Sequence, residues 1–302
     1  MSFSEDVRHE LVERPPAKSC CRLAFLSGLI RHAGSLQMRS GGELAAVAEL
    51  ADPAAARLAF TLLRERGADC EILSFREHRF QRRNRVLLRI AGGTSIQLLH
   101  EAGVLSEALT PLERPPRRLL NRACCRGAYL RGALVAAGSV SAPRQPAHLE
   151  VRTAELEAAE ALAEVAAAEE IPMRTASRRG HAIAYLKSRD AIRDLLALVG
   201  AHDAVLSLQE AEVISATREA ANRLTNCDRA NLGRASAAAH RQSEAIALLD
   251  LELLHPRLRR VAELRMANPS SSMAELGERA HPPMTKSAVA RHMKTLISLT
   301  KT

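Results

Sequence analysis

The chain contains an internal repeat. The segment CCRLAFLSGLIRHAGS, from Cys20 to Ser35, returns as CCRGAYLRGALVAAGS from Cys124 to Ser139. Nine of the sixteen aligned residues are identical without a gap, whereas roughly one or two would match by chance in a chain of this composition. Because two copies of one unit in a single chain form a pseudo-dimer, we expect the two segments to meet near a pseudo-two-fold axis.

Length and composition predict a cytoplasmic protein of two or three domains. The 302 residues suffice for more than one hydrophobic core, and 47% of them are apolar, as is ordinary for a globular protein. No apolar run reaches the roughly 18 residues that a membrane span needs. The charged N-terminus MSFSEDVRHELVERPP lacks the apolar centre of a signal peptide.

The charge balance indicates a polyanionic partner. The formal net charge is +9 and the isoelectric point is about 9.8. A genomic bias toward arginine would explain why few of the basic residues are lysine, but it would not explain the net charge. Aromatic residues make up only 2% of the chain, and proteins that grip single strands usually stack bases on aromatic rings. Duplex DNA is therefore the favoured partner.

The six cysteines predict no metal site and no cofactor. Four of them form two adjacent pairs, and neighbouring cysteines do not bridge easily. No C-x-x-C or C…H spacing suggests zinc. We expect small, reduced core residues at Cys20, Cys21, Cys70, Cys124, Cys125 and Cys227.

Periodicity predicts an α+β domain in which both halves follow the order helix, strand, strand, helix, strand, strand, helix, although the first hairpin of each half has only a weak signal. In the first half we expect helices over 20–34, 53–66 and 95–101, and strands over 70–75 and 85–90. In the second half we expect helices over 124–138, 154–170 (capped by Thr153) and 190–199, and strands over 148–152 and 181–187. Matching basic turns, Arg82-Arg83-Asn84 and Arg178-Arg179-Gly180, close one hairpin in each half.

Beyond residue 203 the pattern is helical. One or two helices are expected over 212–250, with amides gathered on one face, either for helix packing or for docking. Three short helices follow, over 257–267, 272–280 and 285–299. Thr285 caps the last of them; Val289, Met293 and Leu296 share one face, and Lys286, Ser287, Ala290, Arg291 and Lys294 share the other. This arrangement predicts a helix-turn-helix, although a plain three-helix bundle with a basic face stays possible.

Two nine-residue stretches resemble the LAGLIDADG motif of homing endonucleases: LSGLIRHAG (26–34) and LRGALVAAG (130–138). The resemblance implies that the motif helices pack at the pseudo-two-fold axis through Gly28 and Gly132, and that a β-saddle carries Arg82, Arg83, Arg178 and Arg179 on or near a DNA surface. The family's catalytic acid precedes the last glycine of each motif. Those positions are Ala33 and Ala137 here, and a methyl group supplies no oxygen to Mg²⁺. We therefore expect no catalytic residues and no nuclease activity.

The wider chain resembles the WhiA family of bacterial DNA-binding regulators, most specifically in RGAYLRGALVAAGSVS, NRLTNCDRANLGRASAAAHRQ and PPMTKSAVARHMKTL. The resemblance implies a degenerate homing-endonuclease fold joined to a helix-turn-helix similar to the promoter-reading domain of sigma factors. It also implies a transcriptional regulator of sporulation, or of cell division and chromosome segregation.

Together these observations predict six segments and a leading function. The segments are a flexible lead-in (1–18), repeat 1 (19–105), an inter-repeat linker (106–120), repeat 2 (121–205), a linker helix (206–222) and a helix-turn-helix domain (223–302). The leading hypothesis is a non-enzymatic, sequence-specific, nucleoid-associated protein whose residues Thr285, Lys286, Ser287, Arg291 and Lys294 contact duplex DNA.

Two other functions stay open at this point. The N-terminal domain could be a platform for a protein, such as an RNA polymerase sigma factor or another transcription or cell-division protein. A residual endonuclease is the remote alternative. Neither a membrane nor a small-molecule substrate is expected as a partner.

Overall fold

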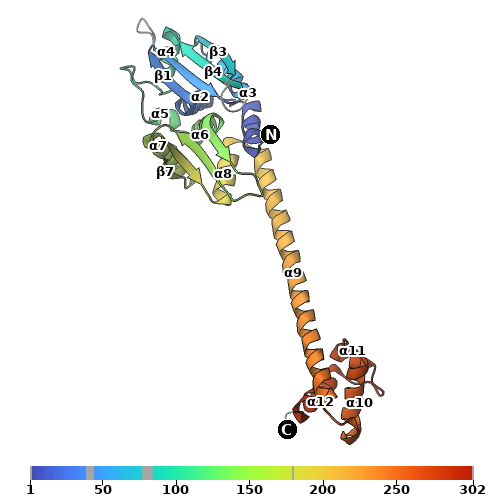
Figure 1. Ribbon diagram of the computed structural model, residues 1–302. Helices are drawn as coiled ribbons and strands as arrows, with labels where there is room; N and C mark the ends of the chain where they lie inside the picture. The colour runs from blue at the N-terminus through green and yellow to red at the C-terminus, as the bar shows by residue number, and fades with distance from the viewer. Residues whose placement is uncertain (1, 39–43, 77–83, 179, 301–302) are drawn as a thin grey trace. The chain divides into compact units, whose positions relative to one another are not determined.

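The computed structural model describes residues 2–38, 44–76, 84–178 and 180–300. The chain divides into two units, Met1–Val213 and Ile214–Thr302 (Figure 1). The first unit combines helices and sheets and the second is helical, which confirms the expected fold class. Each unit has its own cluster of buried apolar side chains.

The first unit contains two copies of the expected αββαββα repeat. The first copy comprises α2 (Ser19–Ala33), β1 (Gly34–Met38), β2 (Leu44–Leu50), α3 (Pro53–Arg64), β3 (Cys70–Arg76), β4 (Asn84–Ala91) and α4 (Gly93–Glu101). The second comprises α6 (Ala123–Ala137), β5 (Gly138–Val140), β6 (Leu149–Thr153), α7 (Leu156–Ala167), β7 (Arg174–Arg178), β8 (His181–Leu186) and α8 (Arg189–Val199). The short helix α5 (Arg117–Leu120) lies between the copies.

The two sheets have the same topology. Each has four antiparallel strands, in the orders β1-β2-β4-β3 and β5-β6-β8-β7. In the second hairpin Arg178 pairs with His181, and Gly180, just before His181, has a φ of +79° that favours glycine. The matching order of strands is the three-dimensional form of the internal repeat.

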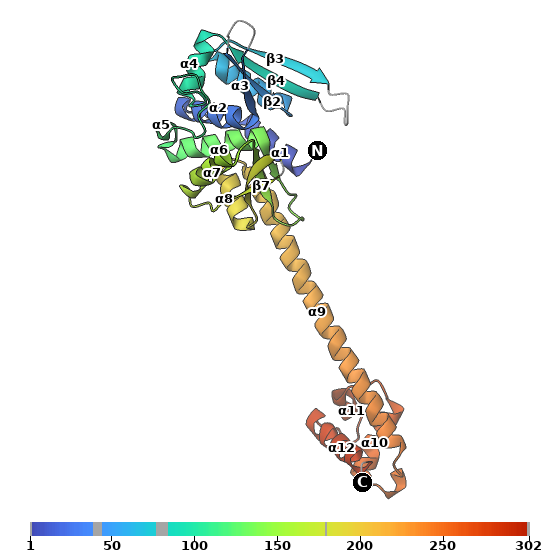
Figure 2. The ribbon, with the colours of Figure 1, turned by 60° about the vertical axis from the view of Figure 1, so that its left-hand side comes forward.

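The two motif helices pack against each other at the centre of this unit. Figures 1 and 2 show α2 and α6 side by side, between the two sheets. A Cβ atom on Gly28 would lie 2.1 Å from the carbonyl oxygen of Tyr129, and one on Gly132 would lie 2.1 Å from that of Phe25. Only glycine permits backbones to approach so closely. The two contacts are reciprocal, as a pseudo-two-fold axis requires.

Part of the segment predicted as a flexible lead-in, residues 1–18, is helical. Residues Phe3–Glu13 form α1, which Ser2 and Glu5 begin with a capping box. The buried side chains of Val7 and Leu11 join the main core. The guanidinium of Arg131, itself buried, donates from Nε to the carbonyl of Leu11 at 2.9 Å. These tertiary contacts order the segment, and a local pattern does not reveal them.

Glu10 connects α1 to the start of the next long helix. Its carboxylate accepts hydrogen bonds from the backbone N–H groups of Asp203 (2.8 Å) and Ala204 (3.1 Å). These N–H groups lie in the first turn of α9 (His202–Ala247), so the positive end of the helix dipole stabilises the carboxylate of Glu10. The linker helix expected over 206–222 and the domain start expected at 223 both fall inside α9.

One predicted cap is wrong. Thr153 is the last residue of β6, and α7 begins at Leu156 with Glu155 as its N-cap. The hydroxyl of Thr153 donates to the carbonyl of Glu155 at 2.8 Å. Pairing of Thr153 with Ala182 of β8 extends the strand to this residue and displaces the helix start.

The second unit ends in a small helical bundle. After α9 come a 3-10 turn η1 (Leu251–Leu253), α10 (Pro256–Ala267), α11 (Met273–Glu278) and α12 (Lys286–Leu299). The last three helices match the three that the sequence predicted. They pack with the end of α9 around a buried core of Ile246, Val261, Ala262, Leu276, Val289, Met293 and Leu296.

Candidate nucleic-acid interface

The helix α12 presents a polar face outside this bundle. Val289, Met293 and Leu296 are buried at 1% exposure or less. The side chains of the opposite face, all exposed, are Lys286, Ser287, Ala290, Arg291 and Lys294. The ion pairs described in this unit lie elsewhere, on α9 and between η1 and α10. Within the described part of this unit, the α12 cations are exposed and do not belong to these ion pairs.

The start of α12 is held by a cap and a tight turn. The hydroxyl of Thr285 accepts a hydrogen bond from the N–H of Ala288 at 3.2 Å. A Cβ on Gly277 of α11 would lie 2.2 Å from the carbonyl oxygen of Met284, so the turn between the two helices needs glycine there. The short second helix, tight turn and exposed third helix have the form of a helix-turn-helix.

A buried arginine fixes the preceding connection. Arg265 is 2% exposed, and its Nη1 donates to the carbonyl of Ser271 at 2.6 Å. It also reaches the carbonyls of Asn268 and Pro269 at 3.3 and 3.4 Å. Burial lowers the pKa of this guanidinium, which remains charged at neutral pH. Sequence reasoning did not identify Arg265, because an arginine among exposed arginines carries no local signal of burial.

The predicted saddle cations are only partly within the described structure. Arg82, Arg83 and Arg179 lie outside the described residues. Arg178 ends β7 with its side chain exposed. The structure therefore places one of the four predicted saddle residues at a strand end.

Other arginines of the first sheet are paired with carboxylates. Val86, Leu88 and Ile90 face the core, so Arg85 and Arg89 project from the opposite face of β4. Arg85 forms an ion pair with Glu49 of β2, and Arg89 Nη1 lies 2.6 Å from the Glu71 carboxylate of β3. A DNA phosphate on this face would have to compete with these carboxylates.

The second sheet has a similar pairing. Glu150, 8% exposed, lies 3.0 Å from His148 Nε2 and accepts from Arg152 Nε at 3.3 Å. Burial alone would raise the pKa of Glu150, but hydrogen bonds from His148 and Arg152 outweigh it and lower that pKa. The carboxylate is therefore charged at neutral pH and offsets part of the positive charge of this face.

The positions of the motif acids offer no metal ligand. Ala33 and Ala137 end α2 and α6, and both are half-buried. Beside Ala33, the Nε2 atom of His32 lies 3.5 Å from the hydroxyl of Tyr129. Burial lowers the pKa of His32 to about 3 and raises that of Tyr129 to about 12, so both are neutral at pH 7. A neutral His–Tyr contact does not replace two carboxylates.

The four paired cysteines come together at the other end of the same helices. The sulfur atoms of Cys20, Cys21, Cys124 and Cys125 all lie within 4.8 Å of one another. Spacing did not predict this cluster, because its two halves lie on separate helices. Cys21 and Cys125 are buried, which raises their pKa values to about 12 and about 11, and Cys124 is exposed.

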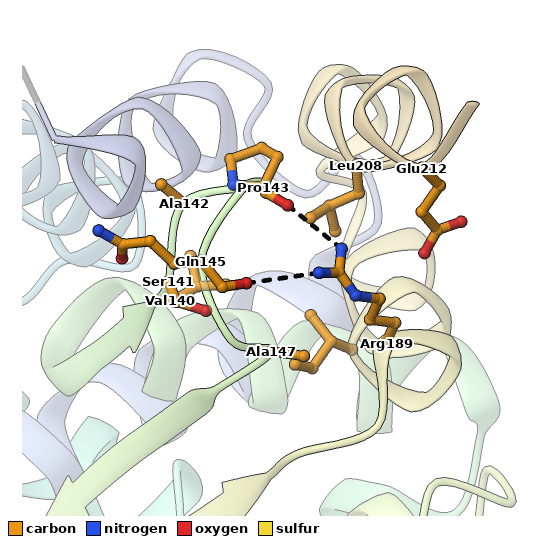
Figure 3. Close-up of a pocket in the computed structure, with 10 residues that line it drawn as sticks. Val140, Ser141, Ala142, Pro143, Gln145, Ala147, Arg189, Leu208 and Glu212 are labelled. Carbon is orange, nitrogen blue, oxygen red and sulfur yellow. Dashed lines mark hydrogen bonds between the residues drawn. The ribbon is translucent and has the colours of Figure 1, made fainter. Parts of the chain in front are cut away.

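The pocket of Figure 3 is too small for a substrate. It is lined by the connection between β5 and β6 together with Arg189, Leu208 and Glu212. Arg189 donates to the carbonyls of Pro143 (3.2 Å) and Gln145 (3.4 Å) and holds this connection in place (Figure 3). The cavity of about 10 Å³ has room for about one water molecule. Among the described residues, no helix combines the length and apolar character needed to cross a bilayer.

Three domain models of one protein family match this chain. The WhiA N-terminal LAGLIDADG-like domain matches residues 19–105, the WhiA LAGLIDADG-like domain matches 126–219, and the WhiA C-terminal HTH domain matches 221–300.

Proteins that are similar over nearly the whole chain also carry the name WhiA. The probable cell division protein WhiA of Heliobacterium modesticaldum is 35% identical, over 99% of this chain and 96% of that protein. The protein of that name from Desulforudis audaxviator is 39% identical, over 98% and 96%. The crystal structure of full-length DUF199/WhiA from Thermatoga maritima covers 100% of this chain and 98% of its own, with a TM-score of 0.61 and 23% identity. It shares the fold.

Proposed function

This chain belongs to the WhiA family, and from that premise we propose that it is a non-enzymatic, sequence-specific duplex-DNA-binding protein that regulates transcription. The observation that carries the proposal is the exposed basic face of α12, held behind a capped turn. The name of its relatives, cell division protein, supports a role in cell division. The proposal extends this role to chromosome segregation or sporulation, at the nucleoid of the cytoplasm.

In this proposal α12 enters the major groove. Ser287 and Arg291 lie on the exposed face, where a hydroxyl and a guanidinium can read base edges. Lys286 and Lys294 flank them and neutralise phosphates, which fix the register on the duplex. The hydroxyl of Thr285 caps the helix, so its contribution to DNA binding is to orient α12 and to aim the helix N-terminus at a phosphate.

The test is binding of the full-length chain to its preferred duplex, selected from a random pool, with affinity measured by fluorescence anisotropy over a range of salt. We expect the double variant Arg291→Ala, Lys294→Ala to lose at least about tenfold in affinity and to flatten the salt slope by about 1 to 2. The control, Arg57→Ala with Arg229→Ala, removes two exposed cations elsewhere. Unchanged affinity in the α12 variant, or an equal loss in the control, contradicts the assignment.

A second function of the N-terminal unit is favoured by the ion pairs of its sheets. Because Arg85 and Arg89 are paired with Glu49 and Glu71, we propose that this face serves as a platform for a protein partner, such as a sigma factor or another transcription or cell-division protein. The residual DNA affinity of the α12 double variant tests this. If adding Arg178→Ala lowers that residual affinity further, the first unit contacts DNA.

The absence of catalysis is part of the proposal. Alanine at both acid positions of the motif supports it, because phosphodiester hydrolysis assisted by metal ions needs oxygen ligands. Incubation of purified protein with supercoiled plasmid and Mg²⁺ or Mn²⁺ should leave the plasmid intact. Nicking that copurifies with the chain and disappears on heat inactivation would establish an enzyme.

A further inference from the structure

Four thiols from two distant parts of the chain converge at the pseudo-two-fold axis. Cys20 and Cys21 lie in the first turn of α2, and Cys124 and Cys125 lie in the first turn of α6. Their sulfur atoms lie within 4.8 Å of one another, and those of Cys20 and Cys21 are 4.0 Å apart. Core packing does not require four sulfur atoms to converge on one point.

The spacing of the sulfurs fits a single tetrahedral ion. With zinc–sulfur bonds of about 2.3 Å, the sulfurs of a four-cysteine zinc site lie about 3.8 Å apart. Small side-chain rotations would therefore bring all four sulfur atoms to bonding distance. An iron–sulfur cluster would hold its cysteines further apart, because inorganic sulfide separates them. We propose that Cys20, Cys21, Cys124 and Cys125 together bind one zinc ion.

Positive groups beside the site offset the burial of Cys21 and Cys125, which by itself disfavours thiolates. Zinc with four thiolates carries a net charge of −2, and the N-termini of α2 and α6 both point their positive ends toward it. Neither N-terminus is capped by a side chain, because Lys18 and Arg122 occupy the N-cap positions. Arg122 adds a positive charge beside Cys20. The N–H groups of Cys21 and Cys125 already donate to the carbonyls of Lys18 and Arg122, so the helix ends act on the site through their dipoles.

The proposed role is structural. Cys20 and Ala33 are separated by nearly the whole of α2, about 20 Å at 1.5 Å per residue. The ion therefore lies far from the former catalytic acids. Binding one ligand pair from each repeat, it joins the two halves across their axis, where Gly28 and Gly132 already bring the helices together.

The wild-type protein provides the first test. Full-length chain, freed of any histidine tag and purified under reducing conditions, should contain one zinc per chain by elemental analysis. Cobalt added to metal-free protein should give thiolate-to-cobalt charge transfer and the strong visible bands of tetrahedral cobalt. A chelator should lower the Tm of the first unit by about 5 °C or more. Fully reduced protein that binds neither ion contradicts the proposal, and so does purification with these cysteines joined as disulfides.

Variants separate binding from packing. Cys124 is exposed, so Cys124→Ser removes a ligand with little effect on the core; zinc content should fall at least fivefold after dialysis. Cys227→Ser, the matched control at another exposed cysteine, should keep one zinc per chain. Retention of zinc by both Cys124→Ser and Cys21→Ser would show that the ion is bound elsewhere.

Discussion

At the scale of single residues, glycine and alanine at a few positions define what this scaffold can do. Gly28 and Gly132 permit the close approach of α2 and α6, and their carbonyl contacts mirror each other. Ala33 and Ala137 stand where the resemblance places catalytic acids. The same motif therefore retains its packing residues and lacks its chemical ones.

Substitution of the axis glycines should destabilise the first unit. A Cβ at Gly28 or Gly132 would lie 2.1 Å from a backbone carbonyl oxygen of the other helix. Since backbone cannot move aside as a flexible side chain can, we expect Gly28→Ala to lower the free energy of unfolding by about 2–4 kcal/mol. Chemical denaturation followed by circular dichroism measures this change.

Gly93→Ala is the matched control for that prediction. Gly93 is the first residue of α4, and a Cβ there meets no atom within 4 Å. Alanine should leave stability unchanged or raise it by about 0.5 kcal/mol, because it restricts the unfolded chain. Equal effects at Gly28 and Gly93 would show that the axis tolerates side chains.

At the scale of elements, a cap and a turn fix the start and the orientation of α12. The hydroxyl of Thr285 satisfies an N–H of the first turn, and Gly277 permits the turn before it. An exposed cationic face is useful for reading DNA only when the helix that carries it is held in one orientation. The local signals of this element are strong, which is why its bounds were predictable.

Thr285→Ala should destabilise the helical unit by about 1 kcal/mol, because the N–H of Ala288 loses its partner. Thr285→Ser keeps the capping oxygen and should restore both stability and DNA affinity. Thr295→Ala, at an exposed hydroxyl in the middle of α12, is the control and should change neither. Thermal unfolding and anisotropy on the same samples make the comparison. A loss of affinity with unchanged stability would instead indicate a direct phosphate contact.

At the scale of the whole molecule, the two units have separate cores. The apolar cluster of the first unit extends to Leu208, and that of the second begins at Ile246. The long helix α9 contains the boundary between them. Because the clusters share no residue, a mutation in one cluster should have little effect on the stability of the other unit.

Core truncations should therefore shift separate transitions. Leu276 is fully buried in the second unit, and Leu276→Ala should lower the stability of that unit by about 2–4 kcal/mol through the cavity it leaves. Leu99→Ala is its counterpart in the first unit, where Leu99 is 1% exposed. Differential scanning calorimetry should show each variant moving one transition. Movement of both transitions by a single variant would indicate one cooperative molecule.

The sequence by itself determined the elements and their repetition. Periodicity and the cap at Thr285 are local properties, because each depends on residues within a few turns of one another. The repeat is visible because two stretches of the sequence can be compared directly. They were enough to predict two αββαββα repeats, a helical tail and the polar face of α12.

Only the tertiary structure decided which distant residues meet. It ordered α1 through Arg131, paired Arg89 with Glu71, and gathered four cysteines from two helices. Hydrogen bonds, ion pairs and metal ligation act over a few ångströms in space, and separation along the chain does not reveal that distance. The pairing of charges on the sheet faces and the convergence of the four cysteines therefore became visible only in the tertiary structure.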